Sequence, residues 1–112
     1  MKIRVSICAL FSLLLLTLSA AAEEWRNVPM VDTMCAAKVK AKPDDHPRSC
    51  ALQCQKSGFG IIAADGTFLT FDAAGNAEAI AALKAAKHTD HLRVTVSGTR
   101  EGNTIKVKKL TL

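Results

Sequence analysis

The stretch "FGIIAADGTFLTFD" is the strongest local signal in the chain, because one turn joins two short apolar runs. The runs cover residues 59–64 and 67–71, and Asp65-Gly66 lies between them. An Asp-Gly pair in this position is typical of a β-hairpin, since both turn residues need positive φ. The sequence therefore predicts two paired strands near the middle of the chain.

Regular patterns on both sides of the hairpin indicate three more strands and a helix. Alternating apolar residues in "HLRVTVSG" and "TIKVKKLTL" predict two half-buried strands, with "TREGN" as the turn between them. "WRNVPMV", residues 25–31, predicts a first strand in which Pro29 lies at an edge or bulge. "AAGNAEAIAALKAAKH" predicts a helix with Asn76 as its N-cap.

A segment with two cysteines separates the first strand from the hairpin. "DDHPRSCALQCQKSG", residues 44–58, predicts a short helix with Pro47 in its first position and Gly58 just past its end. His46 fits the cap position, because a residue before proline avoids helical angles. Residues 32–43 are polar and rich in lysine, so they are expected to form a loop.

The order of these elements predicts the fold class. Apart from the cysteine helix, three strands, a helix and two strands follow one another, as in the five-stranded barrel of the OB-fold. We therefore expect a mainly β, α+β chain with an OB-fold-like barrel and the cysteine helix between the first two strands. An α+β sandwich of the same elements is the main alternative.

The first 22 residues have the pattern of a secretory signal peptide. A short basic start is followed by an apolar run through Leu18 and by small residues, with cleavage expected before Glu23. The run is too short for a membrane span, which needs about 20 residues. Residues 23–112 are then a single OB-like domain, periplasmic or secreted, with 13 basic against 10 acidic residues, a net charge of +3.

The cysteines of this domain are odd in number, in a compartment that favours disulfides. They are Cys35, Cys50 and Cys54. On a helix the Cβ atoms of Cys50 and Cys54 would lie about 5–6 Å apart, whereas a disulfide needs roughly 3.5–4.5 Å. We therefore expect a disulfide from Cys35 to Cys50 or Cys54, which leaves one spare thiol.

A soft-metal site is the alternative for the same residues. Cys35, Cys50, Cys54 and His46 form a possible Cys3His set, suited to Cu(I) or Zn(II). The spacing lacks the C-x2-C pairs of established zinc modules, and an oxidising compartment competes for the thiols. His46, placed before Pro47, is the doubtful fourth ligand.

Other residues have simpler roles. Asp32 and Asp72 fit turns or caps, and His88 with His91 fits a solvated loop better than an H-x2-H metal site. Nucleic-acid binding is a third alternative, but the chain is only mildly basic. Phe68 and Phe71 face opposite sides of their strand. None of the common catalytic motifs is present, so we expect no enzyme.

The segments "VDTMC", "HPRSCALQC" and "SGFGIIAADGTFLTFD", with the closing "LRVTVSGTREGNTIKVKKLTL", resemble a group of small secreted bacterial proteins with a single OB-like domain and a cysteine-containing loop helix. The resemblance covers nearly all of residues 23–112. It implies location and fold, and carries over no catalytic or binding residue. The sequence thus predicts a non-enzymatic binding or interaction domain for an envelope protein or a small ligand, with no cofactor unless the cysteines hold a metal.

Overall fold

The computed structural model describes residues 22–112 of the chain. The strands are β1 (Glu23–Asp32), β2 (Phe59–Ile62), β3 (Phe68–Phe71), β4 (Arg93–Glu101) and β5 (Thr104–Thr111). The helices are α1 (Ala36–Val39), α2 (Arg48–Gln53) and α3 (Ala73–Ala85), with the short 3-10 helices η1 (Pro43–Asp45) and η2 (Gln55–Ser57). The predicted signal peptide, residues 1–22, lies outside the described residues except for Ala22. Across residues 22–112, every helix is too short or too polar to span a membrane.

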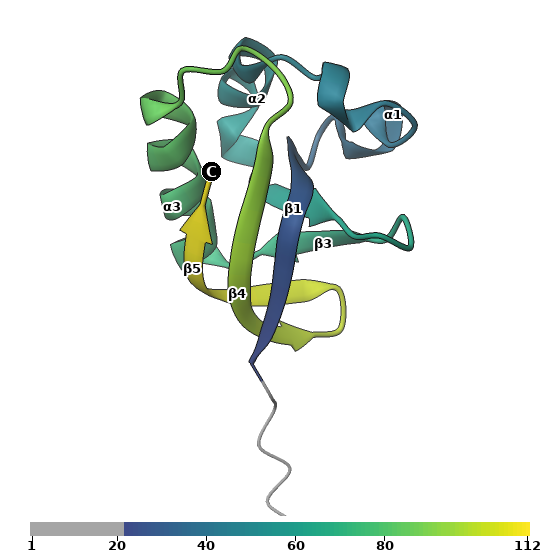
Figure 1. Ribbon diagram of the computed structural model, residues 1–112, viewed down its shortest axis with the longest axis vertical. Helices are drawn as coiled ribbons and strands as arrows, with labels where there is room; N and C mark the ends of the chain where they lie inside the picture. Colours follow the sequence, from purple (N-terminus) through teal and green to yellow (C-terminus); the bar gives the residue numbers. More distant parts are fainter. Residues whose placement is uncertain (1–21) are drawn as a thin grey trace, which may run out of the picture.

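The strands close into a barrel in the order β1-β2-β3-β5-β4 (Figure 1). β1 pairs antiparallel with both β2 and β4, and the β2–β3 and β4–β5 pairs are antiparallel as well. The β3–β5 pair is parallel and closes the barrel. This connectivity confirms the predicted OB-fold-like barrel, rather than the sandwich.

The barrel interior is built by strand alternation. Along β4, Val94 and Val96 are buried and the residues between them are only partly so, as the sequence pattern predicts. Other large apolar side chains at most 2% exposed include Met30, Phe59, Ile61, Leu69 and Ile105 on the strands and Leu83 on α3. Burying one such side chain contributes about 1.5–3 kcal/mol, so this interior is the main source of stability.

The β2–β3 hairpin is confirmed, with shorter strands than predicted. Ile61 pairs with Leu69, and the turn lies around Asp65 and Gly66. Of the two turn residues only Gly66 has a positive φ, of 85°. Asp65 instead uses its carboxylate to accept a hydrogen bond from the backbone N–H of Thr67, at 3.0 Å.

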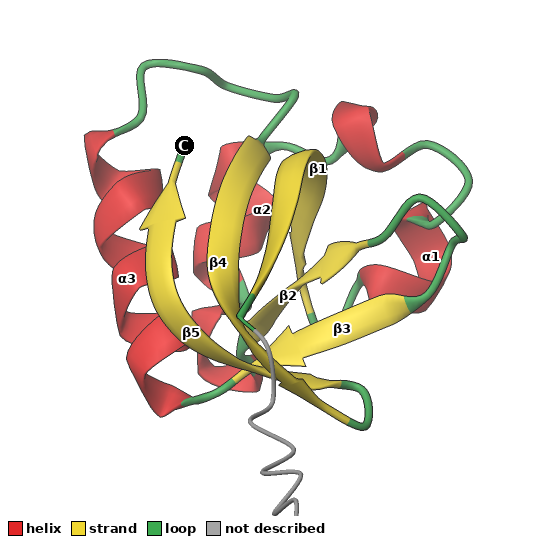
Figure 2. Ribbon diagram, turned by 60° about the horizontal axis from the view of Figure 1, so that its bottom comes forward, coloured by secondary structure: helices red, strands yellow, loops and turns green. Residues whose placement is uncertain are grey.

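α3 lies beside β5 and covers one side of the barrel (Figure 2). It begins earlier than predicted, because Asp72 is its N-cap and accepts a hydrogen bond from the backbone N–H of Gly75, at 3.0 Å. The prediction that Asn76 caps this helix was therefore wrong. Asn76 lies inside the helix, and its side-chain oxygen accepts a hydrogen bond from the N–H of Phe59 in β2, a partner that local sequence does not reveal.

The connection between β1 and β2 lies at one end of the barrel, where Figure 1 shows α1 and α2 near the tip of β1. α1 falls within residues 32–43, which the sequence predicted to be a loop. The single helix predicted from Pro47 to the residue before Gly58 is divided into α2 and η2, and η1 precedes it. Pro47 is the N-cap of α2 and not its first residue, so the prediction that His46 caps this helix was wrong by one position. Gly58 ends η2 as predicted, with φ at 83°.

Candidate metal site

Asp32 is the last residue of β1, and its side chain points into the protein with 0% exposure. Its Oδ2 atom accepts a hydrogen bond from the backbone N–H of Cys35, at 3.0 Å. Its Oδ1 atom lies 2.6 Å from Nε2 of His46. A carboxylate removed from water needs such partners, so this end of the barrel is organised around the charge of Asp32.

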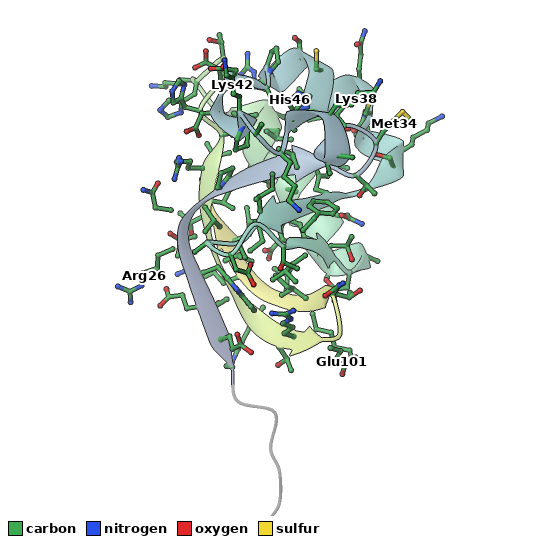
Figure 3. The ribbon with its side chains drawn as sticks, turned by 90° about the vertical axis from the view of Figure 1, so that its right-hand side faces the viewer. Arg26, Met34, Lys38, Lys42, His46 and Glu101 are labelled. Carbon is green, nitrogen blue, oxygen red and sulfur yellow. The ribbon has the colours of Figure 1, made fainter. Side chains whose placement is uncertain are left out.

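His46 reaches Asp32 because of its position before Pro47. The proline keeps His46 in an extended conformation, with φ −74° and ψ 116°, so the chain cannot continue the turn of η1. The side chain of His46 is 5% exposed. The position before Pro47 counted against His46 as a ligand in the sequence, yet it directs the ring toward Asp32. In Figure 3, His46 lies at the same end of the barrel as Met34 and Lys42.

Cys35 contributes the sulfur of the cluster from the N-cap position of α1. Burial, the Asp32 carboxylate and the neighbouring Cys54 thiol, in decreasing order of effect, together raise the pKa of its thiol to about 11. Cys35 is therefore protonated at neutral pH. A cysteine nucleophile needs a lowered pKa, so this environment suits a buried thiol or a metal-bound thiolate better than covalent catalysis.

Together Asp32, Cys35 and His46 offer one oxygen, one sulfur and one nitrogen, and these three atoms lie within 4.8 Å of one another. Carboxylate, thiolate and imidazole are the side chains that bind zinc in proteins. The donor set therefore fits a borderline divalent cation. It includes two of the residues that the sequence suggested as ligands, Cys35 and His46.

The other two suggested ligands lie outside this three-residue cluster. The Cys54 thiol is a neighbour of the Cys35 thiol and interacts with it. Cys50 lies within α2 and is half-buried. Within residues 22–112, Cys35, Cys50 and Cys54 are all free thiols, so the disulfide from Cys35 to Cys50 or Cys54 stays a prediction.

Asp32 is the residue that sequence reasoning missed, since it was assigned to a turn. Its hydrogen bond to the N–H of Cys35 is indeed a local turn contact. Its second oxygen, however, faces His46, which lies far along the chain. The signal that could have found it is a carboxylate at the end of a buried strand three residues before a cysteine, in "VDTMC".

The histidines of the α3–β4 loop do not belong to the cluster. His88 and His91 are exposed, and Nδ1 of His91 lies 2.8 Å from Oδ1 of the adjacent Asp90. That carboxylate raises the pKa of His91. The pair is a solvated loop contact, as expected from the sequence.

A shallow groove of about 310 Å3 adjoins α1. It is lined by Thr33, Ala36, Ala37, Lys40, Ile62 and Phe68. Phe68 is half-buried here while Phe71 is buried, so these two rings face opposite sides as predicted. The groove offers a nucleobase one partly exposed ring, which is a small platform for stacking.

Comparisons of the chain with models of protein families, with curated proteins and with solved structures each found no significant match.

Proposed function

We propose that this protein is a non-enzymatic metal-binding domain that takes Zn(II), or a cation of similar chemistry, at Asp32, Cys35 and His46. The observation that carries the proposal is the convergence of three ligand atoms of different kinds within 4.8 Å of one another. The signal-peptide pattern of residues 1–22 supports a site of action in the periplasm or outside the cell.

The charges of the cluster favour a divalent cation. An ionised Asp32, a Cys35 thiolate and a neutral His46 carry two negative charges, which one divalent ion balances. Cu(I) would leave one negative charge uncompensated, and Asp32 has no contact with water that could solvate it. Zn(II) therefore fits this donor set better than Cu(I).

A metal bound by both Asp32 and His46 would have to displace the proton between them and move the two side chains apart. Their atoms are 2.6 Å apart, the separation of a hydrogen-bonded pair that shares a proton. Two ligands on a tetrahedral zinc, each bound at about 2.0–2.1 Å, lie about 3.3 Å apart. The cation would therefore replace this proton and the proton of Cys35, and it would separate the pair by less than an ångström.

Three protein ligands leave one coordination position of a tetrahedral ion open. That position could be filled by water, by a small ligand or by a donor atom of a partner. This fits a binding or interaction role, with an envelope protein or a small molecule as the partner. Such a partner would have to carry a nitrogen, oxygen or sulfur atom that can bind zinc.

Calorimetric titration of the reduced protein with Zn(II) tests the proposal. We expect one ion per chain, and a loss of affinity of at least ten-fold in Asp32→Asn, Cys35→Ser and His46→Ala. Cys50→Ser and His88→Ala are matched controls, since they change the same residue types outside the cluster. Unchanged zinc affinity in His46→Ala and Cys35→Ser would refute the site.

A further inference from the structure

Two cysteine-bearing segments are tied together next to the proposed metal site. The Ser57 hydroxyl donates a hydrogen bond to the carbonyl of Cys54, at 2.8 Å, and accepts one from the N–H of Met34, at 3.2 Å. The N–H of Thr33 also donates to the carbonyl of Gly58, at 2.9 Å. These bonds hold the residue before Cys35 against the end of the segment that carries Cys54.

Cys54 has a backbone position that permits pairing with Cys35. It follows the last residue of α2 as the C-cap, with φ −98° and ψ 18°, and its thiol is near enough to Cys35 to contribute to the raised pKa of that thiol. Cys50 lies inside α2, where helical geometry fixes its direction. Of the two partners that the sequence left open, the structure thus favours Cys54.

We infer that Cys35 and Cys54 form a reversible disulfide that excludes the metal, so that thiol oxidation controls the Asp32–Cys35–His46 site. The inference rests on the proposed function. Cys35 is both the only sulfur of the three-residue cluster and the neighbour of Cys54. A sulfur bonded to Cys54 has no thiolate to offer, and a sulfur bound to zinc is shielded from oxidants.

The oxidant is a disulfide, either a small molecule such as oxidised glutathione or a protein disulfide carrier. One thiolate of the pair attacks it and forms a mixed disulfide, releasing one thiol of the oxidant. The second cysteine then displaces the remaining half. In total two S–H bonds are lost and one S–S bond is formed, and the oxidant takes up two electrons and two protons to become two thiols.

The test uses the protein equilibrated with oxidised and reduced glutathione, with and without Zn(II). Alkylation followed by peptide mass spectrometry identifies the paired cysteines, and calorimetry gives the zinc affinity of each form. We expect the oxidised protein to lose alkylation at Cys35 and Cys54, to keep it at Cys50, and to bind zinc at least ten-fold more weakly. Preloaded zinc should slow oxidation by a similar factor.

Two variants separate this switch from the site itself. Cys54→Ala should bind zinc with the affinity of the reduced wild type and keep that affinity in oxidised glutathione, whereas Cys50→Ser should still switch. Pairing of Cys35 with Cys50, or an oxidised protein that binds zinc as the reduced one does, would overturn the inference alone. A reduced wild type that binds no zinc would overturn the proposed function, while the peptide map would still report the pairing.

Discussion

Oδ1 of Asp32 and Nε2 of His46 lie 2.6 Å apart in a pair that is almost closed to solvent, since the residues are 0% and 6% exposed. A buried carboxylate is costly unless it is hydrogen-bonded, and removing its partner leaves a polar group without one away from water. Proteins can keep such pairs for a role other than stability. Here the pair supplies two of the three donors of the proposed metal site.

Asp32→Asn should lower the free energy of unfolding of the metal-free protein by about 3 kcal/mol, since it breaks the buried pair. Urea denaturation followed by circular dichroism measures the change. Asp45→Asn is the control, because Asp45 is exposed on the neighbouring 3-10 helix and should change stability by less than about 0.5 kcal/mol. If both substitutions changed the free energy of unfolding equally, the buried contact between Asp32 and His46 would not stabilise the fold.

The strands and the hairpin could be predicted because their signals are local. Alternation of apolar and polar residues sets which side chains of β4 face the interior, and the Asp-Gly pair sets the position of the β2–β3 turn. The order of elements then limited the topology to few choices. What decided between barrel and sandwich was the β3–β5 pairing, which joins residues more than thirty positions apart.

The site could be predicted only in part, because its contacts are not local. Cys35 and His46 were singled out as candidate ligands by their residue types, and the structure brings both of them close to Asp32. Asp32 was assigned to a turn because one of its two hydrogen bonds is a turn contact and the other crosses 14 residues. The extended backbone at His46 follows from Pro47, but its direction toward β1 depends on the path of the whole connection.

The raised pKa of the Cys35 thiol predicts a pH dependence of stability. In the folded protein this pKa is about 11, against 9.0 for a free thiol. The unfolded chain therefore loses this proton first, and the free energy of unfolding should fall between pH 9 and 11, by about 1 kcal/mol per pH unit at most. Urea unfolding across this range measures it, and Cys35→Ser should lack this contribution to the slope.

The ion pair between Asp44 and Arg93 should influence the metal site from outside. Arg93 donates two hydrogen bonds of 2.9 Å to the Asp44 carboxylate, and thereby ties η1, which precedes His46, to β4. Asp44→Asn should cost no more than about 1 kcal/mol, because the pair is partly solvated. We expect zinc affinity to fall several-fold, and a titration of this variant beside wild type checks it. An unchanged affinity would show that η1 is held in place by its other contacts.

The same ion pair predicts that the free energy of unfolding falls as the pH is lowered. For Cys35 it falls as the pH is raised. Arg93 lowers the pKa of Asp44, so its contribution to stability is present above the unfolded pKa and is lost as the pH falls through the lower, folded value. Unfolding measurements from pH 5 downwards should show a shallower decline for Asp44→Asn than for wild type. Parallel curves would mean that the pair contributes nothing in solution.

Oxidation should make the domain more stable although it removes the metal site. A disulfide from Cys35 to Cys54 closes a loop of roughly 20 residues, which corresponds to about 3 kcal/mol in the chain-entropy model. The metal-free oxidised protein should therefore unfold at higher urea concentration than the metal-free reduced protein, with Cys54→Ala showing no difference. A less stable oxidised form would mean that the bond distorts the connection between β1 and β2.

X-ray absorption at the zinc edge tests the central claim most directly, because it counts the atoms bound to the ion. For the reduced protein loaded with one equivalent of Zn(II), we predict one sulfur at about 2.3 Å and nitrogen or oxygen neighbours at about 2.0–2.1 Å. Cys35→Ser should lose the sulfur, and Cys50→Ser should keep it. A shell with no sulfur, or a sulfur that survives in Cys35→Ser, would contradict a site built from Asp32, Cys35 and His46.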